Sequence, residues 1–144
     1  MATVFDVASY ILQEKGPMTA MKLQKLVYYS QAWSIVWDDD VLFTAPIEAW
    51  DNGPVVRSLW DCTRGQFRID ILPYGNPDSL NATQKETIDL VLDFYGNKDA
   101  QWLSDLTHLE RPWKYAYAQG KNTGIDLGVM SEFYSTLSPN EIVG

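Results

Sequence analysis

The chain has 144 residues, 46% of them hydrophobic and six of them tryptophan, which is enough apolar material for a buried core and excludes a disordered chain. Its 19 acidic and 11 basic residues give a net charge of −8, which disfavours sequence-independent nucleic-acid binding and favours a basic protein partner. The one cysteine excludes an internal disulfide, and no segment approaches the roughly 18 apolar residues of a membrane span. Since the first residues also lack a basic leader, we expect a single cytoplasmic domain over residues 1–144.

Two helices are predicted in the first quarter of the chain. Residues 4–15 form the first, because Thr3 and Asp6 have the spacing of a reciprocal helix cap and Gly16-Pro17 ends it. From Lys22 to Trp37 apolar and aromatic residues recur at three- and four-residue steps, which predicts a long central helix capped by Thr19. We expect neighbours on several sides of this helix and a narrow polar face. That face comprises Lys22, Gln24, Lys25, Gln31 and two serines.

A helix, a short turn and a second helix also suggest a DNA-binding transcription regulator. A recognition helix presents Arg, Asn or Gln near its N-terminus to the base edges. The second helix here begins with Lys22 and Lys25 and continues with large apolar side chains. A purely structural helix pair is therefore favoured, and DNA binding is kept as the alternative function.

The centre of the chain predicts irregular structure with a small β element. Asp38-Asp39-Asp40 breaks the central helix, and the spacing of these acids does not match a cation-binding loop. Short apolar runs at 41–43 and 46–50 predict extended structure, and Asp51-Asn52-Gly53-Pro54 predicts a turn. We expect a helix from Pro54 to Gly65, then a short strand over residues 67–71.

The remaining part of the chain is predicted to be helical. Thr83 and Glu86 have capping-box spacing at the start of one helix, and another starts near Asp99. Pro112 begins a short helix that ends at Gly120, and a last helix runs from the Asp126 cap to Ser138-Pro139. The fold is therefore expected to be mainly α, a compact single-domain helical bundle around a central long helix, with a small β element.

Motifs for catalysis are missing from the sequence. It contains no phosphate-binding glycine loop, nucleophile elbow, dinucleotide fingerprint or paired metal ligands. A structural role for His108 at a helix end is favoured over a catalytic one, because no nucleophile accompanies it, and Cys62 has no adjacent positive charge to activate it. We therefore expect no enzyme activity, no cofactor and no metal, with an enzyme centred on His108 as a minor alternative.

Four segments, in order, resemble the Panacea domain, the family of SocA-like antitoxins and the phage-associated protein GepA. They are MKLQKLVYYSQAW, LF followed by PIEAWDNGPVV, WLSDLTHLERPWKYAY, and an ID turn followed by MSEFYSTL, from about Thr19 to Leu137. The resemblance implies an antitoxin that neutralises, by direct protein contact, a toxin typically encoded beside it. The SocA-like case implies a proteolytic adaptor that delivers the toxin to a Clp-type protease. Residues 37–41 depart from the Gly-Lys-type turn common in the family, so the toxin's identity stays open.

Two of these motifs supply the candidate partner-binding residues. Their turn chemistry is compatible with exposure, and Trp50 and Trp113 each border a proline-containing turn where an indole can face a partner. The candidates are Trp50, Asp51, Asn52 and Pro54 from the first motif and His108, Glu110 and Trp113 from the second. A second interpretation, in which both motifs only brace the fold, is kept open, as is the oligomeric state.

Overall fold

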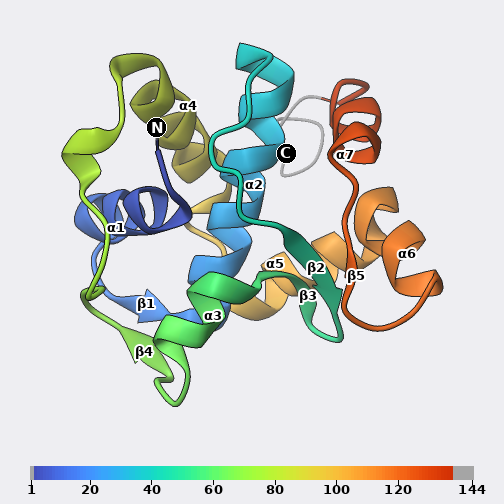
Figure 1. The fold of residues 1–144 in the computed structure, drawn as a ribbon, viewed down its shortest axis with the longest axis horizontal. Helices are drawn as coiled ribbons and strands as arrows, with labels where there is room; N and C mark the ends of the chain where they lie inside the picture. Colours follow the sequence, from blue (N-terminus) through green and yellow to red (C-terminus); the bar gives the residue numbers. More distant parts are fainter. Residues whose placement is uncertain (1, 138–144) are drawn as a thin grey trace.

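The computed structural model describes residues 2–137, and within this range the chain folds into seven α-helices and several short strands (Figure 1). The helices are α1 (Val4–Lys15), α2 (Ala20–Asp38), α3 (Arg57–Thr63), α4 (Ala82–Tyr95), α5 (Ala100–Leu109), α6 (Arg111–Ala118) and α7 (Leu127–Tyr134), with the 3-10 helix η1 at Pro77–Ser79. The strands are β1 (Met18–Thr19), β2 (Ile47–Trp50), β3 (Gly53–Val56), β4 (Arg68–Ile69) and β5 (Thr123–Gly124). The predicted mainly α fold is confirmed.

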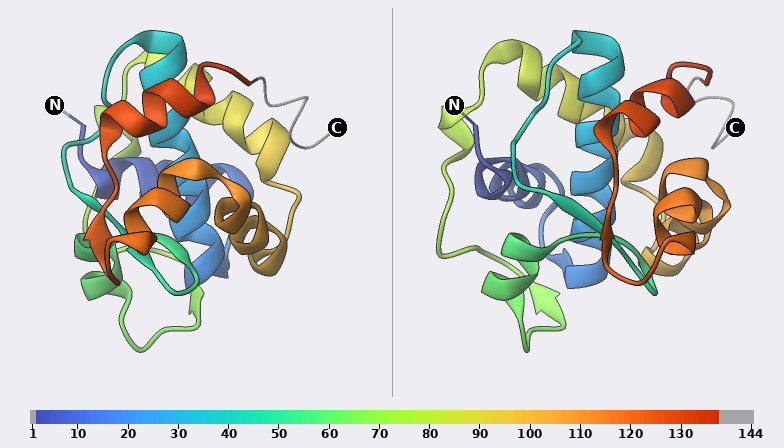
Figure 2. Two further views of the ribbon diagram at one scale, coloured as in Figure 1. Left: turned by 90° about the vertical axis from the view of Figure 1, so that its right-hand side faces the viewer. Right: turned by 45° about the vertical axis from the view of Figure 1, so that its right-hand side comes forward.

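The central helix α2 passes through the middle of the molecule and packs against α1, α4, α5 and α7 (Figures 1 and 2). Thr19 caps it as predicted, because its side chain accepts a hydrogen bond from the Lys22 amide. Every residue from Leu23 to Ser34 is buried. Burial by neighbours on several sides explains why the apolar residues of this helix spread over more than one face.

The prediction that the glutamines of α2 belong to a polar face is wrong. Both glutamines are buried, and their side chains bond to backbone groups. Gln31 accepts a hydrogen bond from the Leu42 amide over 2.6 Å and donates one to the Phe43 carbonyl over 2.7 Å. Gln24 accepts from the Val56 amide over 2.9 Å and donates to the Val56 carbonyl over 3.2 Å. Each side chain thus serves as a partner for an extended segment whose buried backbone groups need one.

The same burial removes the basis of the DNA-binding alternative. A recognition helix lies in the major groove with its reading face exposed. Between Leu23 and Ser34, α2 has no exposed face that a DNA groove can receive. The first helix pair is therefore part of the core.

The strands β2 and β3 form an antiparallel hairpin in which Trp50 lies opposite Gly53, so that Asp51 and Asn52 make the predicted turn. Strand β5 pairs with the other edge of β2 and completes a three-stranded sheet. The prediction of a helix from Pro54 is wrong: residues 53–56 are β3, and α3 begins at Arg57. Residues 53–56 form a strand because they pair with β2 and bond to the Gln24 side chain. Neither partner can be recognised from the local sequence pattern.

Two other predicted boundaries need correction. The capping box of α4 consists of Asn81 and Gln84, two residues before the predicted pair. The strand predicted over 67–71 is restricted to β4, where Ile69 is buried opposite Met18 of β1. Phe67 and Ile71, which the alternation placed on the same face as Ile69, are each 82% exposed.

The remaining helix starts agree with prediction. Thr3, Asp99 and Asp126 cap α1, α5 and α7, and Asp6 completes the reciprocal cap of α1. α7 ends at Tyr134, and the predicted stop at Ser138-Pro139 lies outside the described residues. No helix within residues 2–137 combines the length and the apolar character that crossing a membrane requires.

Candidate functional site

The turn between β2 and β3 is held against α5 and α6. The indole N–H of Trp113 donates to the Trp50 carbonyl over 2.8 Å, and Nε2 of His108 lies 2.8 Å from the Asp51 carbonyl oxygen. Ser104 of α5 donates to the Asn52 carbonyl over 2.7 Å. The structure thus brings together the two motifs that the sequence singled out, although 63 residues separate Trp50 from Trp113.

The side chain of Asp51 fixes the tip of the turn to the end of α6. Its two carboxylate oxygens accept hydrogen bonds from the Tyr117 hydroxyl and from Lys121 Nζ, the latter over 3.4 Å. The Tyr117 hydrogen bond, and after it the Lys121 hydrogen bond, lower the pKa of Asp51 below its ordinary value. Asp51 and Asn52 nevertheless remain exposed. The turn is therefore fixed on one side and open on the other.

His108 and Trp113 form the support of this turn. Their rings meet edge to face with centroids 4.2 Å apart, and Trp113 stacks on Tyr117 at 4.5 Å. Both residues are half-buried. His108 is hydrogen-bonded as the structural interpretation requires, but its partner is the hairpin and not the end of its own helix. These contacts give both side chains a bracing role.

Glu110 does not lie on the surface, contrary to the exposure expected of a partner-binding residue. It is 4% exposed, and its Oε1 accepts hydrogen bonds from the hydroxyls of Tyr29 and Tyr134, each over 2.7 Å. Burial raises the pKa of Glu110 to about 7, against the opposing effect of these two hydrogen bonds. Glu110 therefore joins α2, α6 and α7 inside the core.

Pro54 is also buried, and its carbonyl accepts a hydrogen bond from Nζ of Lys25 over 3.1 Å. Lys25 is 1% exposed, and burial lowers its pKa to about 7. From the sequence, Lys25 was expected on the narrow polar face of α2. Its spacing from Tyr28 and Ala32 puts it on the second apolar stripe of the helix, and that spacing was the available indication of burial.

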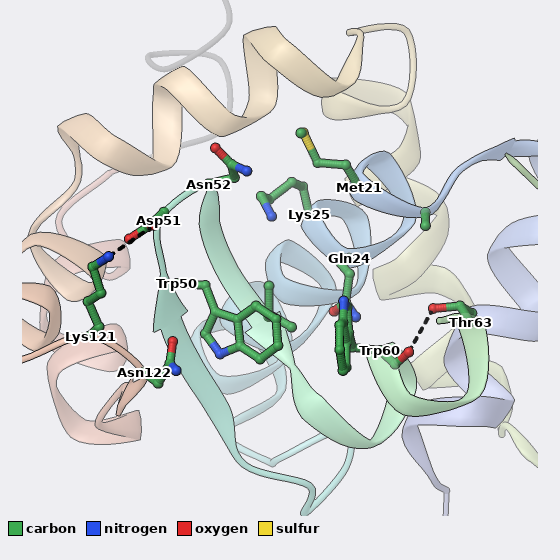
Figure 3. Close-up of a pocket in the computed structure, with 12 residues that line it drawn as sticks. Met21, Gln24, Lys25, Trp50, Asp51, Asn52, Trp60, Thr63, Lys121 and Asn122 are labelled. Carbon is green, nitrogen blue, oxygen red and sulfur yellow. Dashed lines mark hydrogen bonds and ion pairs between the residues drawn. The ribbon is translucent and has the colours of Figure 1, made fainter. Parts of the chain in front are cut away.

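A pocket of about 510 Å³ opens between the hairpin, α2 and α3 (Figure 3). Trp50 and Trp60 contribute aromatic walls, and their ring centroids lie 5.2 Å apart in an edge-to-face arrangement. Asp51 and Asn52 from the turn, Lys25 from α2 and Lys121 complete much of the lining. Trp50, Asp51 and Asn52 were predicted as site residues, whereas Trp60, Lys25 and Lys121 were not, because only the tertiary fold brings them to the turn.

The described part of the chain offers little to a metal or to nucleophilic chemistry. No group of three His, Cys, Asp or Glu side chains within residues 2–137 is arranged to hold a metal ion. Cys62 is half-buried, and burial together with nearby Asp61 raises the pKa of its thiol, which disfavours the reactive thiolate.

A protein-family model described as "Antitoxin SocA-like, Panacea domain" matches residues 23–114. This range runs from α2 into α6, so it contains both motifs and most of the pocket lining. Neither the curated proteins nor the solved structures compared with the chain gave a significant match. The family resemblance seen in the sequence is thereby confirmed.

Proposed function

Because the chain belongs to the family of SocA-like antitoxins with a Panacea domain, we propose that it neutralises a cognate toxin protein by direct binding and without catalysis. We assign the contact to the turn face, defined as Trp50, Asp51 and Asn52 together with the adjoining pocket. His108 and Trp113 support this face from behind. Pro54 and Glu110 are buried and are left out of it.

The observation that carries this proposal is the one-sided fixation of the turn. Hydrogen bonds from Ser104, His108 and Trp113 hold its backbone, while Asp51 and Asn52 stay exposed at its tip. A surface that is already fixed in its binding conformation loses little conformational entropy when a partner docks. An exposed turn beside an aromatic pocket also resembles protein interfaces, where tryptophan anchors are enriched.

The charge of the chain supports a basic toxin. A net charge of −8 attracts a positively charged partner over distances of the order of the Debye length, about 8 Å at physiological salt, and accelerates its association. The rate at which the two proteins associate should therefore fall when salt is added. We expect the toxin to be encoded by the neighbouring gene.

Growth rescue tests the proposal. The neighbouring open reading frame is expressed alone and with this protein, and we expect it to arrest growth only when alone. Asn52→Arg puts a bulky charge at the tip of the turn and should abolish rescue. Asn97→Arg makes the same change at another exposed asparagine, between α4 and α5, and should leave rescue intact. Full rescue by Asn52→Arg, with both variants folded, would contradict the turn face as the toxin contact.

Delivery to a Clp-type protease is a finer proposal within the same function. If this protein is an adaptor, the toxin's half-life should shorten only when this protein, the protease and ATP are all present. If it is an inhibitor, the toxin should stay intact and inactive in the complex. Measuring toxin lifetime and toxin activity in the same reconstituted mixture separates the two.

A further inference from the structure

Lys25 is a buried amine whose charge has no opposite charge beside it. An ammonium group can donate three hydrogen bonds. In the described structure Nζ of Lys25 donates to the Pro54 carbonyl, and no carboxylate of residues 2–137 forms an ion pair with it. Burying a charge without a counter-ion is costly. An amine in this situation gains more from an incoming carboxylate than an exposed lysine does.

When the Lys25 amine is protonated, the pocket that it lines carries one unbalanced positive charge, although the chain is acidic. The charged side chains that line it are Lys25, Asp51 and Lys121. Asp51 and Lys121 lie 3.4 Å apart and neutralise each other. Lys25 is left as the unbalanced charge of the lining. Its 1% exposure means that a carboxylate reaches it only by entering the pocket.

The position of Lys25 is set by the hairpin. Gly53 packs so closely on the lysine stem that a Cβ built at Gly53 would lie 2.6 Å from Cε of Lys25 and 2.8 Å from Oγ1 of Thr107. The side chain is therefore fixed before any partner arrives. Trp50 and Trp60 line another part of the same pocket as apolar walls (Figure 3). Apolar walls next to a fixed charge favour a ligand that combines an apolar group with a carboxylate.

We propose that this pocket receives an acidic side chain of the bound toxin, with Lys25 as its ion-pair partner and Trp50 and Trp60 covering an apolar residue next to it. This inference rests on the proposed function and specifies the chemistry of the toxin segment. The acidic surface attracts a basic toxin at long range, and Lys25 selects one carboxylate at contact. The two effects act over different distances and do not conflict.

Two blocked dipeptides test the pocket without any toxin. N-acetyl-Phe-Glu-amide carries the carboxylate, and N-acetyl-Phe-Gln-amide differs from it only in lacking that charge. We expect the Glu peptide to shift the indole N–H resonances of Trp50 and Trp60 in NMR spectra. It should also raise the pH at which the Cε resonance of Lys25 titrates. The Gln peptide should bind about tenfold more weakly or worse.

Two lysine variants serve to test whether the preference for the Glu peptide depends on Lys25. Lys25→Met should remove the preference for the Glu peptide, and Lys114→Met, at an exposed lysine of α6, should keep it. The wild-type titration stands on its own should Lys25→Met fail to fold. Equal binding of both peptides, an unmoved Lys25 resonance, or no shift up to about 10 mM peptide would overturn the proposal.

The peptide test and growth rescue fail independently. Rescue that depends on Asn52, combined with peptides that do not distinguish Glu from Gln, removes the carboxylate site and leaves the antitoxin function standing. A clear preference for the Glu peptide without rescue removes the antitoxin function and leaves a carboxylate-binding pocket.

Discussion

Trp113 donates its indole N–H to the carbonyl oxygen of Trp50 over 2.8 Å and thereby joins the start of α6 to the end of β2. His108 packs edge to face against the same indole and reaches the next carbonyl of the hairpin. The contact explains how two motifs far apart in the sequence belong to one site. It also assigns them different roles, since the first motif carries the open turn and the second supports it.

Two substitutions of Trp113 should distinguish the contribution of its hydrogen bond to stability from the contribution of its ring packing. Trp113→Phe removes the indole N–H and should lower the free energy of unfolding by about 0.5–1.5 kcal/mol. Trp113→Ala removes the ring as well and should cost roughly 2–4 kcal/mol, because the side chain is only half-buried. Urea unfolding measures both. Tyr115→Ala, at a position 53% exposed on the same helix, is the control and should change stability by less than about 0.5 kcal/mol. A similarly small loss in Trp113→Ala would refute the bracing role.

Gly53→Ala should destabilise the protein more than Gly65→Ala. Both glycines have positive φ, +114° at Gly53 and +83° at Gly65, so both substitutions add backbone strain of about 1 kcal/mol or more. Only at Gly53 would the new Cβ also press on Lys25 and Thr107, whereas at Gly65 nothing lies within 4 Å. Overpacking should add about 1–3 kcal/mol at Gly53. Thermal and urea unfolding of the two variants measure the difference, and equal losses would rule out the close packing on Lys25.

Glu110 should make stability fall as pH rises from about 4.5 to about 7. Its pKa is raised from 4.5 to about 7 in the folded protein, so in this range the unfolded chain releases a proton that the folded chain keeps. Its favourable contribution is complete below pH 4.5 and lost by the time the folded group ionises, at most about 3 kcal/mol in all. In Glu110→Gln, whose amide oxygen can still accept from Tyr29 and Tyr134, this pH dependence should disappear.

The measurement for Glu110 is the difference in unfolding free energy between wild type and variant at several pH values. Glu132→Gln, at an exposed position of α7, serves as the control. It should leave the pH profile parallel to that of the wild type. A Glu110→Gln profile that also runs parallel would show that Glu110 titrates as an ordinary exposed carboxyl.

Lys25 should act in the opposite direction at higher pH. Its pKa is lowered from 10.5 to about 7, so between these values the unfolded chain binds a proton that the folded chain does not. Stability from this group is complete above pH 10.5 and is lost as pH falls to about 7, by no more than about 5 kcal/mol. Relative to Lys25→Met, the wild type should therefore gain stability from pH 7 to pH 9. The profiles of wild type and Lys114→Met should run parallel. If the profile of Lys25→Met also runs parallel to that of wild type, the Lys25 amine stays charged in the fold.

The sequence by itself determined most of the helices and the character of the core. Local chemistry is sufficient there: Thr3, Thr19, Asp99 and Asp126 cap their helices by accepting hydrogen bonds from amides three residues away. The turn at Asp51 and Asn52 was likewise predicted, because residue types with turn preferences act within four positions. Trp50, Asp51 and Asn52 were thereby identified as site candidates.

Only the tertiary structure decided what the polar residues of α2 do and where the pocket lies. From the sequence alone, Gln24 and Gln31 are expected on the surface. In the fold they are buried, because backbone segments that are distant in sequence lie beside them and bond to their side chains. Pro54 is in a strand because β2 lies next to it, although its local sequence favours a helix start. Glu110 and Lys25 are buried because distant segments cover them: tyrosines of α2 and α7 surround the carboxyl, and the hairpin closes over the amine. Burial and pairing are properties of segments that meet in space, so one-dimensional spacing does not reveal them.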